Sequence, residues 1–420
     1  MDFETPKLIY DVVVIGGGAA GTMAAITAAR NGARVAVVEK NQSIGRKLCI
    51  TGKGRCNITN ACDMDELIAN VPENGRFMYS SLSQFSNYDI IDFFESIGVK
   101  TVVERGNRVF PASQNAKDVK EALLRELKKL NVKIYYGTKV TAIITENGFV
   151  KGVKLSENEM VLYSEKVILA TGGKSYPLTG STGDGYGFAE KLGHTVTPLK
   201  PCLVGVKTRE KFTSAMAGLT LKNVGVSFYH GNKNIYNDFG ELLFTHTGVS
   251  GPVVLSASFE LAKYDYNDVK LIIDLKHALT EEQLLARIDR DFEKFARKIF
   301  ANSLDELLPK SMVPVIVKLS GIDPDKNVSQ ISKEERKALA RLLKNFELNI
   351  VDSCPFDEAI VTLGGVKTSE INPKTMESKI IGGLYIVGEL LGVTAYTGGF
   401  NLTVAFSTGF AAGKDAAEKF

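Results

Sequence analysis

The sequence has no run of eighteen apolar residues, and this absence predicts no membrane-spanning helix. Its opening, MDFETPKLIYD, is acidic and holds no apolar run, so we expect no signal peptide and a cytoplasmic location. A strong net charge is also missing, since 51 Lys and Arg face 48 Asp and Glu. The balance of +3 argues against a nucleic-acid partner. With 420 residues, 44% of them hydrophobic, the chain is typical of a soluble globular protein of two or three compact units.

Cysteine is scarce, and its spacing argues against two kinds of site. The five cysteines stand at positions 49, 56, 62, 202 and 354, with no CxxC pair and an odd total. This pattern does not predict a disulfide framework. No histidine lies near the first three cysteines, so we expect no metal site there either.

What the sequence does contain is a strand, a glycine-rich turn and a helix in immediate succession. The apolar run VVVI predicts a buried strand, an Ala-rich helix follows, and a second apolar strand ends at Glu39. The turn reads Gly16-x-Gly18-x-x-Gly21, the dinucleotide-binding fingerprint in its expected context. Gly16 permits the tight turn, Gly18 lets the backbone approach a pyrophosphate, and Gly21 lets helix and strand pack closely. Glu39 is placed to accept the adenosine ribose hydroxyls.

The bound nucleotide is predicted to be FAD. An acid at position 39 argues against the 2′-phosphate of NADP. Three further segments, residues 116–143, 166–194 and 382–419, each combine a strand with a helix. A simple NAD dehydrogenase has no use for them, whereas the longer FAD must be held at several points by distant parts of the chain.

The pattern of apolar and charged residues changes in the middle of the chain. Residues 1–194 and 350–420 read as two parts of one α/β nucleotide-binding domain. Short β-type runs over residues 195–278 predict an inserted β unit, and residues 279–349 predict an inserted helical unit. Two capping boxes, Thr280/Gln283 and Ser332/Glu335, support charged amphipathic helices in the helical unit.

The block GRKLCITGKGRCNITN, residues 45–60, holds three glycines, two cysteines and four cationic side chains without a helical or strand period. It is not a nucleotide-triphosphate loop, because Lys53 is followed by Gly54 rather than by Ser or Thr. A redox dithiol is disfavoured, because disulfide reductases of similar fold separate their cysteines by four residues, whereas six separate Cys49 from Cys56. We favour a glycine-permitted loop whose amides and cations line the pyrophosphate and the flavin edge, with both cysteines as packing groups.

Five blocks, in order along the chain, resemble one bacterial family. They are the block above, GNRVFPAS, ATGG followed by TGDGYGFAEKLGH, GELLFTHTGVSGP, and GLYIVGE followed by GGFNLTVAFSTGFAAG. They are similar to blocks of the BaiN/YhiN-type flavoproteins, also catalogued as aminoacetone-oxidase-like FAD-binding enzymes. The resemblance covers nearly the whole chain. It implies a glutathione-reductase-type FAD/NAD(P)-binding Rossmann-like domain, interrupted by a β-barrel-like unit and a helical unit.

The resemblance also implies which residues surround FAD. The glycine turn and the residues just after the second strand would hold the ADP half, and the last helix would aim its N-terminal dipole at the pyrimidine carbonyl of the flavin. The predicted cofactor-binding residues are Gly16, Gly18, Ala19, Ala20, Gly21, Glu39, Lys40, Arg46, Lys47, Thr51, Gly52, Gly54, Arg55, Cys56, Asn57, Val140, Ala170, Thr171, Gly172, Gly388, Glu389, Gly398, Gly399, Asn401 and Leu402.

This chain departs from many relatives near the flavin. Where they carry Leu-Asp-Val, it has Leu391-Gly392-Val393, so an acid near the flavin is missing. Two residues elsewhere are candidates for catalysis. His246, in a turn after a β run, is a candidate proton donor or a structural residue that orders its loop. Arg108, on a hairpin, is a candidate ligand of a substrate carbonyl or carboxylate, or an ion-paired surface residue.

The predicted function is an FAD-dependent oxidoreductase that passes hydride through flavin N5 to or from a small organic substrate, with NADH or NADPH as the donor. No second GxGxxG is present, so a nicotinamide would bind only transiently. The alternatives are a flavin oxidase that uses O₂ and a flavin-binding RNA-associated or regulatory protein. We expect no metal, nucleic-acid or membrane partner, and the sequence leaves the oligomeric state open.

Overall fold

The computed structural model describes residues 8–157 and 159–418 and divides the chain into two compact units. Unit 1 holds Met1–Lys200 and Ile360–Phe420, and unit 2 holds Pro201–Ala359. The boundaries therefore fall after residues 200 and 359, later than the 194 and 349 that the sequence suggested. The second boundary differs because strand β18 (Phe346–Ser353) completes the barrel of unit 2.

Unit 1 is built on a parallel sheet with the strand order β20-β11-β2-β3-β7. Its strands are β2 (Val12–Ile15), β3 (Val35–Glu39), β7 (Lys133–Tyr136), β11 (Lys166–Leu169) and β20 (Leu384–Ile386). The three inner strands are buried along their whole length, as expected for a parallel sheet that is covered on both faces. Strand β20 comes from the C-terminal part of the chain, so this sheet joins both parts of unit 1.

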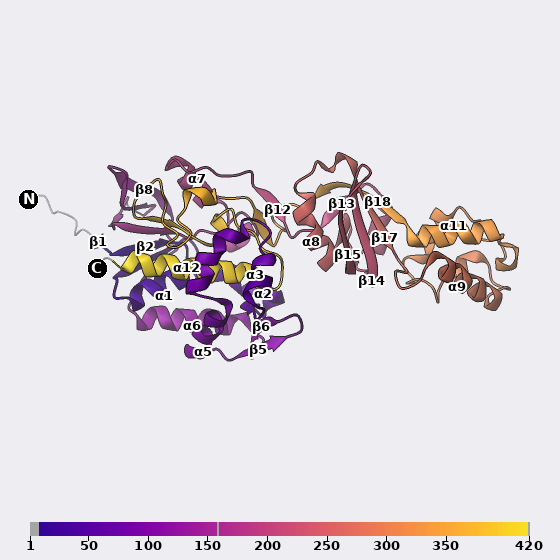
Figure 1. Cartoon of the computed structure of the whole chain (residues 1–420), viewed down its shortest axis with the longest axis horizontal. Coiled ribbons are helices and arrows are strands. Elements are labelled where there is room, and N and C mark those ends of the chain that lie inside the picture. The colour runs from indigo at the N-terminus through magenta and orange to yellow at the C-terminus, as the bar shows by residue number, and fades with distance from the viewer. Residues whose placement is uncertain (1–7, 158, 419–420) are drawn as a thin grey trace, which may run out of the picture. The chain divides into compact units, whose positions relative to one another are not determined.

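Helices α1 (Ala19–Arg30) and α12 (Phe400–Ala417) pack side by side, as Figure 1 shows in indigo and yellow. Their contact depends on small residues. A Cβ atom on Gly409 or Gly413 would collide with the carbonyl oxygen of Ala20 or Ala24, respectively. The last helix is thereby fixed against the helix of the glycine fingerprint.

Two smaller sheets and several helices complete unit 1. The strands are β1 (Leu8–Ile9), β8 (Val140–Glu146), β9 (Phe149–Leu155), β10 (Val161–Tyr163), β4 (Thr59–Asn60), β5 (Thr101–Glu104) and β6 (Arg108–Pro111), with β19 (Val361–Leu363) at the return of the chain. The helices are α2 (Arg46–Gly54), α3 (Met64–Ala69), α4 (Tyr79–Gln84), α5 (Asn87–Ser96), α6 (Ala116–Lys129), α7 (Asp184–Lys191) and the short 3₁₀ helix η8 (Gly388–Leu390). Among the described helices, none is both long and apolar enough to cross a membrane.

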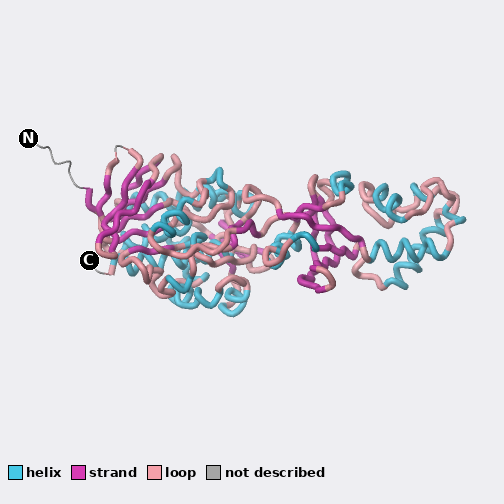
Figure 2. The backbone as a smooth tube through the Cα atoms, turned by 90° about the horizontal axis from the view of Figure 1, so that it is seen from above, coloured by secondary structure: helices cyan, strands magenta, loops and turns pink. Residues whose placement is uncertain are grey.

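Unit 2 combines a closed six-stranded barrel with helices. The barrel order is β13-β16-β15-β14-β17-β18, formed by Val206–Thr208, Gly248–Ser250, Lys233–Phe244, Thr220–His230, Val269–Asp274 and Phe346–Ser353. The helices are α8 (Pro252–Leu261), α9 (Glu281–Lys294), α10 (Val313–Ser320) and α11 (Lys333–Lys344). Figure 2 traces the barrel strands in magenta and the helices in cyan.

The predicted fold class is confirmed in unit 2 as well as in unit 1. Both predicted capping boxes form, at the N-termini of α9 and α11. Phe228 and Phe346 of the barrel belong to the same hydrophobic core as Leu284 of α9 and Leu339 of α11. The β and helical insertions that the sequence separated therefore share one core.

Candidate cofactor-binding cleft

A cleft in unit 1 brings together segments that are far apart in the sequence. The empty space in this cleft, including the part that opens to solvent, has a volume of about 1400 Å³. Most of the predicted cofactor-binding residues line it: Gly16, Gly18, Ala19, Ala20, Glu39, Lys40, Arg46, Lys47, Thr51, Val140, Ala170, Thr171, Gly172, Gly388, Glu389, Asn401 and Leu402. The other predicted ligands, Gly21, Gly52, Gly54, Arg55, Cys56, Asn57, Gly398 and Gly399, lie outside this lining.

The glycine turn presents the N-terminus of α1 to the cleft. Gly16 has a φ of 104°, and a Cβ atom there would lie 2.6 Å from the carbonyl oxygen of Ala170. Gly18 is the N-cap residue, and no side chain caps the helix. Because Gly18, Ala19 and Ala20 line the cleft, this helix end can receive an anionic group such as a pyrophosphate. Gly21 instead faces the backbone of Gly16, which explains its place outside the lining.

Glu39 ends β3 as a buried carboxylate at the edge of the cleft. Its Oε2 accepts a hydrogen bond from the Gly17 amide at 2.8 Å, and its Oε1 accepts from the Asn41 amide at 2.8 Å. The side-chain nitrogen of Asn41 also donates to Oε1, at 2.7 Å. A carboxylate offers about four lone-pair sites, so room is left for a ribose hydroxyl. Glu39 thus also fixes the glycine turn, a role that the sequence did not reveal.

Two predicted cationic ligands of the ADP half, Lys40 and Arg46, form contacts with other side chains of the protein. Lys40 Nζ lies 2.7 Å from Asp184 Oδ2 and contacts the Thr182 hydroxyl. Arg46 donates to the side-chain oxygen of Asn41 at 2.7 Å. Lys40 and Arg46 therefore shape this end of the cleft through contacts with neighbours. The lining residues Asn41, Thr138, Lys139 and Asp184 were missed, although Asp184 lies in one of the blocks that carried the resemblance.

The block at residues 45–60 is not the irregular loop that we expected. Helix α2 begins directly after Gly45 and is interrupted at Gly52 and Lys53, whose φ values are 57° and 58°. Its first turn presents Arg46, Lys47 and Leu48 to the cleft. Thr51, whose ψ of 151° begins the interruption, also lines the cleft, whereas Gly52 and Lys53 lie outside the lining. The sequence pattern did not predict this helix, because the glycines interrupt the apolar periodicity of the block.

Arg55 and the two cysteines of this block have structural surroundings. The Arg55 guanidinium stacks 4.1 Å from the centre of the Phe110 ring and donates to Glu104 at 2.9 Å. Burial raises the pKa of the Cys49 thiol and raises the pKa of Cys56 to about 12. Both cysteines are free thiols. A thiol held in its neutral form is a poor nucleophile, so these surroundings favour packing over redox chemistry.

The N-terminus of α12 reaches the cleft from the opposite end of the sequence. Its N-cap residue is Gly399, and no side chain caps the helix. The Asn401 side chain accepts from the Ala395 amide at 3.1 Å and donates to the Ala395 carbonyl at 2.7 Å, which fixes the preceding loop. Because Asn401 and Leu402 line the cleft, a second uncapped helix N-terminus faces it.

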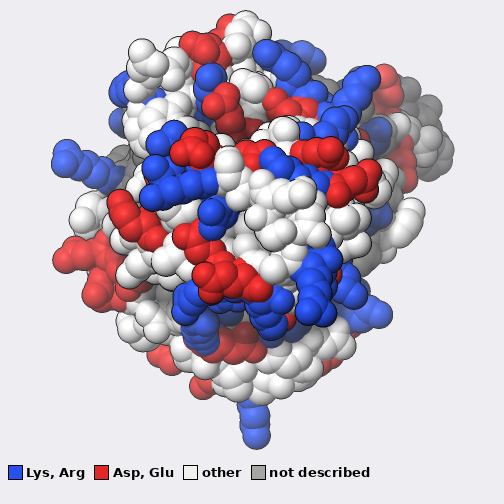
Figure 3. Space-filling model, turned by 90° about the vertical axis from the view of Figure 1, so that its right-hand side faces the viewer, with Lys and Arg blue, Asp and Glu red and all other residues white. Residues whose placement is uncertain are grey.

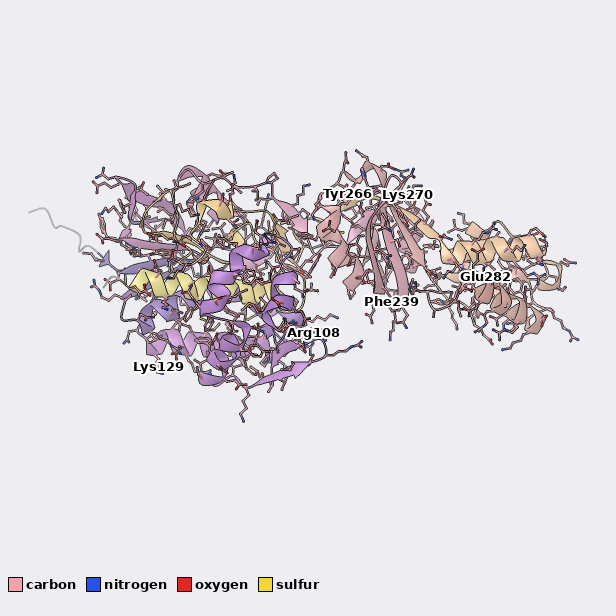
Figure 4. All side chains as sticks on the ribbon, viewed as in Figure 1. Arg108, Lys129, Phe239, Tyr266, Lys270 and Glu282 are labelled. Carbon is pink, nitrogen blue, oxygen red and sulfur yellow. The ribbon has the colours of Figure 1, made fainter. Side chains whose placement is uncertain are left out.

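Neither candidate catalytic residue lines the cleft. Arg108, which is labelled in Figure 4, begins strand β6, and its Nε donates to the Arg105 carbonyl at 3.0 Å. His246 is exposed, between strands β15 and β16 of unit 2. The structure therefore places Arg108 close to the predicted ligand Arg55, since both guanidinium groups lie over the Phe110 ring, but outside the lining of the cleft. His246 belongs to unit 2.

The residues of the cleft fit FAD on an observation that does not depend on the fingerprint, because the uncapped N-terminus of α12 also faces the cleft and suits an anionic group. Thr171 lines the cleft, and its buried hydroxyl oxygen, which has no hydrogen-bond partner among the described residues, packs against Gly185. Gly388 has a φ of 68°, and a Cβ atom there would lie 2.8 Å from the Ala20 side chain. The glycine therefore lets the backbone at residue 388 pack against Ala20, where the C-terminal part of unit 1 meets the N-terminal part.

Comparison with known proteins identifies the class. Residues 10–415 match the family described as "HI0933-like protein Rossmann domain", and the chain belongs to that family. The resemblance drawn from the five sequence blocks is thereby confirmed. The protein is an FAD-dependent oxidoreductase with a Rossmann domain.

Two curated relatives and one solved structure make the likeness specific. The chain is 36% identical to a 3-dehydro-bile acid delta(4,6)-reductase of Clostridium scindens, over 97% of this chain and 98% of that protein. It is 30% identical to a ribosomal RNA dihydrouridine synthase of Escherichia coli, over 97% and 98%. A 3-ketosteroid-delta4-(5alpha)-dehydrogenase from Rhodococcus jostii superposes with a TM-score of 0.52 at 16% identity, over 100% of this chain and 99% of that one. At this identity the superposition shows the fold alone.

Proposed function

We propose that the protein is a reductase that passes hydride to a carbon–carbon double bond conjugated to a carbonyl group in a small organic substrate. NADH or NADPH is the electron donor in this proposal. The names of the two relatives support the choice of bond. A delta(4,6)-reductase acting on a 3-dehydro compound and a synthase that forms dihydrouridine both saturate a double bond that is conjugated to a carbonyl.

The N-terminus of α12 at the cleft is the observation that carries this proposal. Bound FAD supplies a flavin N5 that accepts and donates hydride. The uncapped N-terminus of α12 would stabilise negative charge on the pyrimidine side of a reduced flavin, because the amide groups and the dipole of the helix favour an anion there.

Other lining residues would hold the cofactor in place. The N-terminus of α1 would receive the pyrophosphate, and Glu39 would orient the adenosine ribose. Arg108 and His246 are not needed in this account, because neither lines the cleft.

A small substrate is preferred to RNA on the basis of charge. The face of the molecule in Figure 3 carries Lys and Arg interspersed with Asp and Glu, without a large patch of one sign. An extended basic surface is the usual electrostatic footprint of nucleic-acid binding. The net charge of +3 gives no further support for an RNA partner.

Anaerobic stopped-flow reduction with NADH and with NADPH tests the donor. We expect either NADH or NADPH to bleach the flavin at a rate at least as fast as steady-state turnover. A 3-oxo-Δ4 steroid should then reoxidise the reduced protein. Reoxidation by O₂ but by no unsaturated carbonyl compound would instead support the oxidase alternative. Salt-dependent binding of a uridine-containing RNA that reoxidises the flavin would overturn the preference for a small substrate.

A further inference from the structure

Asn60 is a buried residue that does not belong to the predicted cofactor ligands. It lies in strand β4, and only 3% of its surface is exposed. Its side-chain nitrogen donates to the carbonyl oxygens of Gly106 and Gly398, each at 3.0 Å, and its side-chain oxygen accepts from the Cys62 amide at 3.1 Å. Both neighbours of the nitrogen are acceptors, so both N–H groups are used and the orientation of the amide is fixed.

Gly398 belongs to the turn that leads into α12. Gly398 and Gly399 have φ values of 130° and 105°, which side chains with a Cβ atom rarely adopt. A Cβ atom on Gly399 would collide with the backbone of Thr59. The Thr59 hydroxyl lies 2.7 Å from the Thr403 hydroxyl in the first turn of α12. Strand β4 therefore holds both the glycine turn and the start of the helix.

We propose that Asn60 is a positioning residue that sets the reduction potential of the flavin by fixing the direction of the α12 N-terminus. This inference rests on the proposed function, which puts the flavin at that helix end. The dipole effect is concentrated in the first turn of a helix, so a small reorientation of its N–H groups changes the stabilisation of a nearby anion. Without the Asn60 side chain, the Gly398 carbonyl loses this hydrogen bond, and the turn is held only at its second glycine, by the packing of Gly399 on Thr59.

Asn87 offers a matched control. Its exposed fraction is 2%, and its side-chain nitrogen donates to the carbonyl oxygens of Asn60 at 2.6 Å and Cys62 at 2.8 Å. It thus stabilises the same short segment through the same number of donated hydrogen bonds. Neither of these hydrogen bonds reaches the turn at Gly398.

The test is a reductive titration of the FAD-loaded protein with dithionite against a reference dye, which needs neither substrate nor nicotinamide. We expect Asn60→Ala to make the midpoint potential about 30 mV more negative, a tenfold change in a two-electron equilibrium. The milder Asn60→Ser, which keeps one donor, should give a smaller shift in the same direction, and Asn87→Ala should match the parent. Equal potentials in the parent and both Asn60 variants would overturn the inference. So would the same shift in Asn87→Ala, because a general loosening of the segment would then explain it.

Two outcomes separate this inference from the proposed function. If neither NADH nor NADPH reduces the parent but the Asn60 variants shift the potential, the donor assignment fails and the positioning role stands. If the parent is reduced and the Asn60 variants keep its potential, the positioning role fails alone. If Asn60→Ala does not retain FAD, the comparison of Asn60→Ser with Asn87→Ala decides the question.

Discussion

Lys47 and Glu389 stand 342 positions apart in the sequence and form an ion pair in which Nζ and Oε2 are 2.6 Å apart. The other carboxylate oxygen of Glu389 accepts from the Thr362 amide at 3.0 Å. Both side chains line the cleft and are largely shielded from solvent. The pair therefore connects helix α2 to the C-terminal part of unit 1 at the place where the cofactor is proposed to bind.

Breaking this pair should weaken FAD binding. We expect Lys47→Met and Glu389→Gln each to raise the Kd for FAD about tenfold, roughly 1.4 kcal/mol, because the remaining charge is left partly buried without its partner. The double variant should lose less than the product of the two single losses. Fluorescence titration of the apoprotein measures all three. Arg34→Met is the control, because the Arg34 side chain is exposed and Arg34 does not line the cleft, and this variant should bind FAD within about twofold of the parent. Strictly additive losses would contradict the coupling.

Glu39 should matter for retaining the cofactor and not for the chemistry of the flavin. We expect Glu39→Ala to weaken FAD binding by at least about tenfold, since it removes the acceptor for the Gly17 amide as well as the proposed ribose contact. Glu39→Gln should lose less, because one side-chain oxygen still accepts. The dithionite midpoint potential of flavin that remains bound should stay at the parental value. Parental affinity in Glu39→Ala would remove this residue from the site.

The two cysteines of the 45–60 block should be dispensable for electron transfer. We expect the double substitution Cys49→Ser and Cys56→Ser to keep flavin reduction and reoxidation within about tenfold of the parent, roughly 1.4 kcal/mol of barrier. The two-electron-reduced parent should show no long-wavelength charge-transfer absorbance. A thiolate–flavin band that disappears in the double variant would instead make these cysteines a working dithiol.

His194 should make the stability of unit 1 sensitive to acid. Its Nδ1 lies 3.1 Å from Glu370, and its Nε2 lies 2.9 Å from the Ser378 hydroxyl. That hydroxyl already accepts from the amides of Ile380 and Ile381, so its hydrogen points to Nε2, and the ring is neutral with its proton on Nδ1.

Burial lowers the pKa of His194 from its usual 6.5, although the nearby Glu370 opposes this shift. Below about pH 6.5 the unfolded chain therefore binds a proton that the folded chain resists. As the pH decreases below this value, the free energy of unfolding decreases by up to about 1.4 kcal/mol per pH unit, until the pH reaches the lower pKa of His194 in the folded state. Urea unfolding between pH 5 and 8 measures this slope. His194→Gln should flatten it, and the exposed His246→Gln should leave it unchanged. An unchanged slope in His194→Gln would rule out this origin.

The sequence predicted the parts of the site that are marked by local patterns. Gly16, Gly18 and Glu39 follow from glycines and apolar runs whose spacing reflects backbone geometry, whereas the role of the start of α12 followed from the family resemblance. Gly16, Gly18, Glu39, Asn401 and Leu402 all line the cleft. Local patterns could not reveal the pairing of Lys47 with Glu389 or the anchoring of Gly398 by Asn60, because both depend on contacts between distant segments. Val361 also lines the cleft and belongs to no motif, since only the return of the chain from unit 2 brings it there.

The division of unit 1 into two stretches of sequence imposes an order on synthesis. A ribosome completes Pro201–Ala359 before it makes the strand β20 that pairs with β11, and before the α12 residues that line the cleft. Until then the nascent sheet ends in an open, hydrogen-bonding edge at β11 and FAD has no complete place to bind. If FAD binds in this cleft as proposed, its capture is a late event in the life of each newly made chain, and a chain that stalls within the insertion leaves the β11 edge unpaired.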